Sequence, residues 1–184
     1  MDQLLLEHTQ SVARCMLRYQ YIEFGLKSCL VRFHAAIRFR LAGYLPYEVP
    51  LDALEGAALG LLVKWFKLYS ENQALITAMS KIKAERDFIA HQAYIFTLEE
   101  QSNPAHVQQR LRDLEQAHRR ADECLALLQP EIEQAEQIVQ RAYSDLRARS
   151  EAEGKSPPEA FNPRAINPPA PSEAEPLAQA ERER

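Results

Sequence analysis

Apolar side chains recur every three or four residues along most of the first 149 residues, which is the spacing of one face of an α-helix. The pattern predicts a first helix over residues 2–42, a second over 52–68 and a third over 70–101. A fourth begins at Asn103-Pro104, where Asn suits the cap and Pro the first helical position. We therefore predict an all-α fold, an antiparallel bundle of four to five helices with a long C-terminal helix.

Local signals mark where the predicted helices begin and end. The segment 43–50 contains two prolines, which cannot continue a helix, and reads as a loop. Asp52–Glu55 and Ser70–Gln73 both match the capping box, in which the first and fourth residues cap each other's backbone N–H groups. Gly56 and Gly60 lie one turn apart, and we expect both to allow a close approach between helices.

The fourth predicted helix has the most regular pattern in the chain. Its apolar positions alternate steps of four and three from Val107 to Leu146, which is a heptad seam. Pro130 lies within the seam, and we predict a kinked but continuous helix, with a break into two helices as the alternative. Because such a helix is roughly 60 Å long at 1.5 Å per residue, we expect its outer half to project and pair with another chain.

The composition changes at about residue 150. Seven of the eleven prolines lie beyond this point, among Glu, Ala, Ser and Gln. Such a segment buries too little apolar surface to offset the entropy of ordering it. We therefore divide the chain into a helical bundle over 1–149 and a disordered tail over 150–184.

The overall charge and the cysteines exclude several classes of protein. A net charge of −4 argues against a nonspecific duplex-DNA binder, which is usually basic. Cys15, Cys29 and Cys124 show no CxxC spacing, so we expect a reduced, cytoplasmic chain without disulfides. We find neither a secretory signal nor a membrane span, and no metal-ligand spacing, so no metal or other cofactor is expected.

Two polar residues interrupt the apolar stripes of the third predicted helix. Arg86 falls in step with Leu75, Met79, Ile82 and Ile89, where a core residue is expected, and His91 falls in step with Ala84, Phe88 and Ile95. A buried guanidinium is costly unless it is paired or faces a polar cleft. Glu23 is a candidate partner, although it also forms an i,i+4 surface pair with Lys27.

The segment Arg86-x4-His91, with Asp87 after the arginine and Ala90 before the histidine, resembles the R-x4–6-H motif of the HEPN superfamily. The E-x-x-L-K segment from Glu23 to Lys27 and the Leu59-Gly60 pair are similar to segments of that superfamily. The resemblance implies a small helical bundle. Many such domains are metal-independent ribonucleases or toxins, and others are inactive binding modules beside nucleotidyltransferases.

The resemblance also implies roles for the motif residues. Side chains five apart on a helix point about 140° away from each other, so we expect a homodimer whose two motif helices line one cleft, as in the resembled family. Arg86 would stabilise charge on an RNA phosphate, and His91 would act as general acid or base. Asp87 would orient the imidazole, with Glu23 and Lys83 supporting the site.

Other residues are candidates for weaker roles. Arg32, Arg38 and Arg40 make the end of the first helix basic, where RNA phosphates could bind. His118 also fits the looser spacing of this motif, as R-x5-H after Arg112, but its seam position favours a core or interface histidine.

Two other functions stay open beside a toxin or phage-defence ribonuclease. The first is a non-catalytic helical module that dimerises or binds a partner such as an antitoxin or a nucleotidyltransferase. The second is a small-ligand or nucleotide sensor in which Trp65, Tyr69 or Tyr94 stacks on a base.

Overall fold

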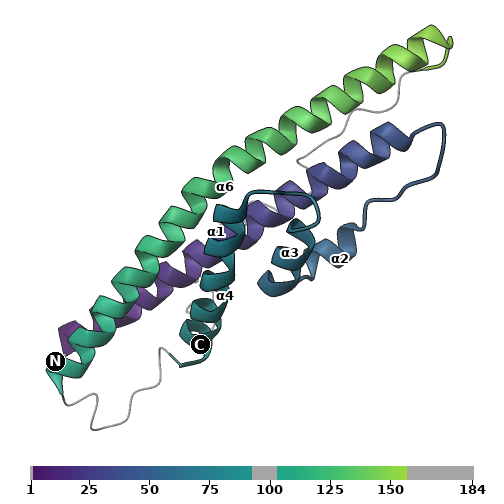
Figure 1. Ribbon diagram of the computed structural model, residues 1–184. Coiled ribbons are helices and arrows are strands. Elements are labelled where there is room, and N and C mark those ends of the chain that lie inside the picture. The colour runs from purple at the N-terminus through teal and green to yellow at the C-terminus, as the bar shows by residue number, and fades with distance from the viewer. Residues whose placement is uncertain (1, 93–102, 157–184) are drawn as a thin grey trace, which may run out of the picture.

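The computed structural model describes residues 2–92 and 103–156, and in this part of the chain the fold is all-α, as predicted (Figure 1). Five helices form a bundle there, and the last of them is the longest. They are α1 (Asp2–Leu41), α2 (Leu51–Glu55), α3 (Leu59–Phe66), α4 (Gln73–Gln92) and α6 (Pro104–Ala152).

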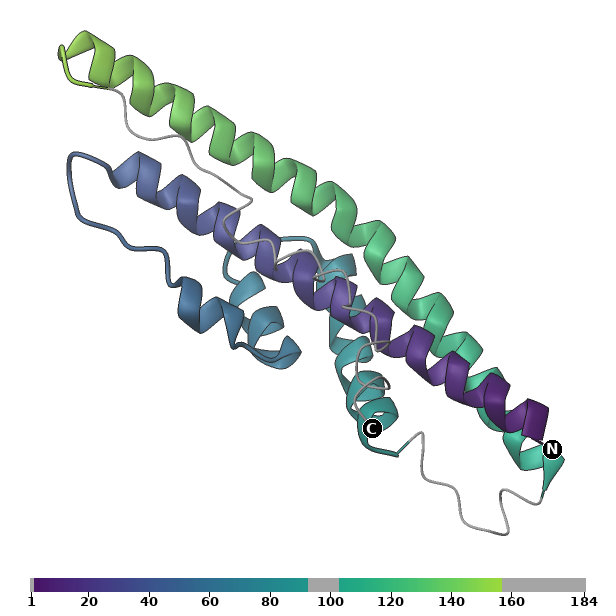
Figure 2. The same cartoon turned by 180° about the vertical axis from the view of Figure 1, so that it is seen from behind.

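The two long helices, α1 and α6, lie side by side in both views and run in the same direction (Figures 1 and 2). The Cys15 thiol near the start of α1 donates to the carbonyl of Leu114 at 3.5 Å. Farther along, Arg32 Nε lies 2.7 Å from Glu136 Oε2. Contacting residue numbers therefore rise together, which is a parallel pair, whereas the sequence had led us to expect antiparallel neighbours.

The helix α4 runs antiparallel to both long helices. Its beginning is held to the middle of α6, where Asn72 Nδ2 donates to Glu131 Oε1 at 2.9 Å. A later turn contacts an earlier part of α6, where Arg120 Nε lies 2.6 Å from Glu85 Oε1. This return of the chain brings the start of α6 back beside the N-terminus of α1 (Figure 1).

The heptad seam of α6 packs against α1 over its whole length. The main core joins α1, α3, α4 and α6, and Leu128 at 1 % exposure lies in it. A second cluster joins the last turns of α1, through Ala36 and Phe39, to the outer half of α6, through Val139 and Ala142. Within the chain α1 therefore covers the seam of this outer half. The expected pairing of the outer half with another chain stays a prediction.

The helix α6 is continuous through Pro130, as predicted, and a break there is excluded. Its N-cap is also the predicted one, since Asn103 Oδ1 accepts from Ala105 N at 3.0 Å. Buried seam residues flank the proline on both sides, Leu128 at 1 % and Ala135 at 0 % exposure. Packing on α1 thus offsets the lost backbone hydrogen bond.

Both predicted capping boxes name the wrong cap. The first helix after the loop begins at Leu51 after Pro50, and no side chain caps it. At the start of α4 the acceptor is Asn72 Oδ1, which lies 3.0 Å from Leu75 N, while Ser70 Oγ instead accepts from Asn72 N at 3.2 Å. At the start of α4 a tertiary contact occupies the predicted cap, because Glu131 Oε2 accepts from Ser70 Oγ at 3.0 Å.

The second predicted helix is divided into α2 and α3. Gly56 is the C-cap residue of α2, and a Cβ there would meet only the Asp52 carbonyl of its own helix, so it mediates no helix contact. Gly60 does, since a Cβ there would lie 2.8 Å from Lys83 Cε of α4. The predicted close approach between helices is therefore confirmed at Gly60 and wrong at Gly56.

Gly25 allows the closest approach of α1 to α6. A Cβ at this position would lie 2.6 Å from Leu128 Cδ2. We predict that Gly25→Val lowers the free energy of unfolding by about 1–3 kcal/mol through overpacking, measured by urea denaturation. In the double variant with Leu128→Ala, the two losses should sum to more than the observed loss, because the smaller side chain makes room. Strict additivity would contradict this assignment.

A buried histidine anchors the loop 43–50 to α1. His34 is 9 % exposed, and its Nδ1 shares a hydrogen bond with the Tyr47 hydroxyl, while Tyr69 Oη lies 3.4 Å from its Nε2. The His34 ring stacks on that of Tyr47 at 6.0 Å and meets Tyr69 edge-on at 5.3 Å. Burial lowers the pKa of His34 below its ordinary value of 6.5.

This histidine should make stability depend on pH. The unfolded chain takes up the proton first, so the stabilisation by neutral His34 is complete above about pH 6.5 and is lost as pH falls through the lowered pKa. We predict that His34→Gln is less stable than the native chain at pH 7 and that the gap narrows toward pH 5, by no more than about 1.4 kcal/mol for every pH unit below 6.5. Urea denaturation at both pH values measures the gap, with exposed His106→Gln as the control. A gap that widens toward pH 5 would exclude the effect.

Several predictions fall on residues outside the described ranges. The expected end of the third helix near residue 101, Tyr94, Ile95 and nearly all of the predicted tail lie there. Within the described residues α6 ends at Ala152, slightly beyond the predicted boundary at 149.

Candidate functional site

The apolar stripe of α4 sets the position of the motif. Leu75, Met79, Ile82 and Ile89 are 0–3 % exposed and belong to the main core, as their spacing predicts. Arg86 lies in step with them, so its backbone is held toward the core while its side chain keeps 31 % exposure. The guanidinium is thus at the edge of the interface between α1 and α4.

Glu23 of α1 meets Arg86 of α4. Arg86 Nη2 lies 3.5 Å from Glu23 Oε1, and Arg86 Nη1 lies 3.3 Å from Asp87 Oδ1. Of the two partners considered for Glu23, the tertiary one is therefore confirmed. Lys27 instead donates to the carbonyl of Glu55, the last residue of α2, at 2.6 Å. The positive charge of Lys27 thus lies at the C-terminal end of α2, where the helix dipole is negative and the interaction is favourable.

His91 lies on the outer side of the same helix and is exposed. Ala84 and Phe88 share that side, and Phe88 is 55 % exposed, so the predicted second buried stripe faces solvent instead. Within one chain, Arg86 faces Glu23 and His91 points away from it. Asp87 accepts a hydrogen bond from Arg86, and the contacts between described residues include none from Asp87 to His91.

The supporting and RNA-contacting candidates occupy different surroundings. Lys83 is exposed, and its aliphatic chain lies over Gly60 of α3. Arg32 is only 16 % exposed and is paired with Glu136 while it donates to Ser28, so it belongs to the contact between the long helices. Arg38 and Arg40 are exposed in the last turns of α1, where a phosphate could reach them.

His118, which follows Arg112 at the R-x5-H spacing, is half-buried. Burial lowers the pKa of His118, and the nearby positive charge of Arg18 lowers it further. His118 lies on the packed side of α6 at the α1 interface, which supports the interpretation as a structural histidine.

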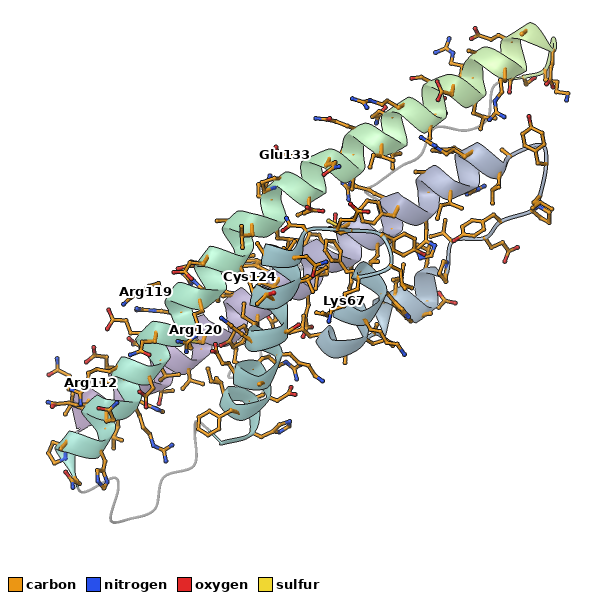
Figure 3. The ribbon with its side chains drawn as sticks, in the orientation of Figure 1. Lys67, Arg112, Arg119, Arg120, Cys124 and Glu133 are labelled. Carbon is orange, nitrogen blue, oxygen red and sulfur yellow. The ribbon has the colours of Figure 1, made fainter. Side chains whose placement is uncertain are left out.

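A cavity of about 450 Å³ beside the motif escaped the sequence-based prediction. It lies between the start of α1, the second half of α4 and the first turns of α6, and its walls are mostly apolar. The Glu85–Arg120 ion pair lines it, and Figure 3 shows Arg120 on the side of α6 that faces α4. In the sequence, the only sign of this cavity is one charged residue in each helix, Glu85 in α4 and Arg120 in α6. Two isolated charges do not predict that the helices meet.

Among the described residues, no group of three His, Cys, Asp or Glu side chains is placed to hold a metal ion. All three cysteines are buried free thiols, and burial raises the pKa of Cys15 to about 11 and those of Cys29 and Cys124 to about 12. Thiols with such pKa values are poor nucleophiles. In the described ranges, each helix is too short or too polar to cross a bilayer.

Comparison with known proteins returns no family model, no curated protein and no solved structure that matches this chain.

Proposed function

We propose that this chain is a HEPN-type RNA-binding domain that acts as a metal-independent endoribonuclease. The observation that carries the proposal is the contact between Glu23 and Arg86, at 3.5 Å. It joins the early E-x-x-L-K segment to the R-x4-H motif, two segments that the resemblance had identified separately. A carboxylate on one helix thus fixes the direction of a guanidinium on another.

The chemistry needs one group to neutralise a phosphate and one to move a proton. Arg86 is 31 % exposed, so its remaining N–H groups can meet a phosphate oxygen and stabilise charge that develops there. His91 is exposed farther along the same helix and can accept a proton from a 2′-hydroxyl or give one to the leaving 5′-oxygen. The products are then a 2′,3′-cyclic phosphate and a 5′-hydroxyl.

Two copies are needed because Arg86 and His91 point to different sides of one helix. The outer side of α4 has small exposed side chains at Ser80 and Ala84, which favour the close approach of a second helix. In such a two-fold pair, both motifs line one cleft, with Phe88 available to be covered. The same proposal includes that the chain acts as a toxin or in phage defence, and that an antitoxin binds it.

The test is cleavage of single-stranded RNA by the full-length chain, with and without a chelator. We expect equal cleavage in both and products that carry a cyclic phosphate. Intact RNA in both reactions would contradict the nuclease, and cleavage only without chelator would contradict the metal-independent mechanism.

One observation favours a non-catalytic interaction module instead. Arg86 already contacts two carboxylates, those of Glu23 and Asp87, so its charge is balanced before any phosphate arrives. An inactive HEPN module would keep this bundle and dimerise or bind a partner such as a nucleotidyltransferase. RNA left intact by a chain that sedimentation shows to be dimeric would favour this function.

A further inference from the structure

A hollow of about 530 Å³ opens where α1 ends and the chain turns into the loop 43–50. The last turns of α1 and residues 43–48 of the loop line it. The last turns of α6 lie at the same end of the bundle, where Arg149 Nη2 donates to the carbonyl of Phe39 at 3.3 Å (Figure 1). The hollow shares no lining residue with the cavity beside α4 and contains no motif residue.

The backbone of this turn is held on both sides of Tyr44. Gly43 has a φ of +87°, which side-chain-bearing residues rarely adopt, and the N–H group of Tyr44 donates to the Leu41 carbonyl at 2.9 Å. Farther along the loop, the Tyr47 hydroxyl shares a hydrogen bond with buried His34. The position of Tyr44 is therefore set before any ligand binds, which lowers the entropy lost on binding.

Tyr44 offers a free aromatic face at the rim of the hollow. The residue is 73 % exposed, and the guanidinium carbon of Arg149 lies over its ring, 5.7 Å from the centroid. With a cation over one face, the other face is open to a flat group. Nucleobases are flat groups that stack on such rings whatever their sequence, because every base has a π face.

This end of the bundle is basic, although the chain as a whole is acidic. Residues 38–48 and 141–155 together carry six Lys or Arg and four Asp or Glu, whereas the net charge of the chain is −4. Arg38 lines the hollow and is exposed, so its guanidinium can meet an anion. Glu48 also lines the hollow and opposes an anion there. The local charge thus complements a phosphate backbone, with one carboxylate acting against it.

We propose that this hollow is a second contact for single-stranded RNA, in which one unpaired base stacks on Tyr44 and an adjacent phosphate pairs with Arg38. The inference rests on the proposed function, which identifies RNA as the ligand of this chain. Arg38 lies fifteen residues after Glu23 on α1, roughly 22 Å along the helix at 1.5 Å per residue. One strand of several nucleotides can therefore contact both the motif and the hollow.

Fluorescence anisotropy of a labelled 2′-O-methyl RNA with the full-length chain tests the stacking. The proposed reaction cannot cleave this strand, because it has no free 2′-hydroxyl. We expect Tyr44→Ala to bind about tenfold more weakly and Tyr44→Phe to bind as the native chain does, because the ring is kept. Tyr21→Ala, which removes a tyrosine of 54 % exposure elsewhere on α1, is the matched control and should keep native affinity. Native affinity in Tyr44→Ala, or no binding by the native chain up to millimolar concentration, would overturn the inference.

The two charged residues of the hollow should change the affinity in opposite directions. Arg38→Gln should weaken binding and reduce the slope of log affinity against log salt by about 0.7, the value for one phosphate of a single strand. Glu48→Gln should strengthen binding, because it removes a repulsion. Arg112→Gln, in the first turns of α6 at the other end of the bundle, is the matched control and should keep the native slope (Figure 3). A native slope in Arg38→Gln, or weaker binding by Glu48→Gln, would overturn the phosphate contact.

Failure of this contact and failure of the nuclease give different results. Weaker binding by Tyr44→Ala, together with a native chain that leaves cleavable RNA intact, would support the hollow and exclude catalysis. Cleavage by the native chain, together with native affinity in Tyr44→Ala, would support catalysis and exclude the hollow. Binding to phosphatidylserine vesicles that Tyr44→Ala loses, while its RNA affinity stays native, would assign the hollow to a membrane surface and overturn the proposal.

Discussion

Replacing His91 with alanine should lower the rate of RNA cleavage by about 10²–10⁴-fold, the usual contribution of a general acid or base. The variant should fold normally, because His91 is exposed and lies on the outer side of α4. The measurement is the initial rate on a labelled single-stranded RNA, with circular dichroism to verify the helical content.

The chain provides a matched control for this variant. His106 is also an exposed histidine on a helix, in the first turn of α6 and outside the motif. His106→Ala should cleave at the native rate. A His91→Ala protein that cleaves as fast as this control would remove the imidazole from the mechanism.

Replacing Phe66 with alanine should lower the free energy of unfolding by about 3–5 kcal/mol, the usual loss for a buried phenylalanine. Phe66 is 0 % exposed at the end of α3, and its ring centroid lies 6.4 Å from that of Phe33 on α1. Phe33 in turn stacks on Tyr69 at 5.6 Å, next to His34. The loss should therefore loosen α3 and the loop that His34 anchors.

Urea denaturation measures this loss, and Leu68→Ala is the matched control. Leu68 lies two residues later and is 74 % exposed, so its truncation should change stability by less than about 0.5 kcal/mol. Similar losses in the two variants would indicate that α3 contributes little to the common core. That result would contradict the packing described for Phe66.

The sequence predicted which residues form the candidate site, but it predicted their arrangement in space only in part. The three-and-four spacing placed Arg86 at a core position, whereas its side chain keeps 31 % exposure at the edge of the core. The resemblance of the E-x-x-L-K segment had suggested Glu23 as its partner. The same spacing predicted a buried stripe for His91 and Phe88, but it gives only relative positions around a helix. Among the described residues Ala84, Phe88 and His91 of this side are exposed, and the first two border only the open cavity beside α1 and α6, so the stripe is not packed.

The basic residues at the end of α1 show a second limit. Arg32, Arg38 and Arg40 look alike in the sequence, yet Arg32 pairs with Glu136 and the other two are exposed. The cavity lined by Glu85 and Arg120 was invisible for a similar reason. The two charges are 35 positions apart, and their meeting depends on how α4 lies against α6.

Helical class, the long C-terminal helix and its continuity through Pro130 all follow from local periodicity, because an apolar stripe at helical spacing can be buried only on a helix. Local periodicity does not predict three other features. These are the direction of α6 along α1, the division between α2 and α3, and the residue that caps α4. The direction of α6 and the cap of α4 depend on contacts between residues far apart in the chain, such as Arg32 with Glu136 and Glu131 with Ser70. Such contacts outweigh local signals, since a cap or a glycine changes stability by about 1 kcal/mol whereas a buried side chain contributes more.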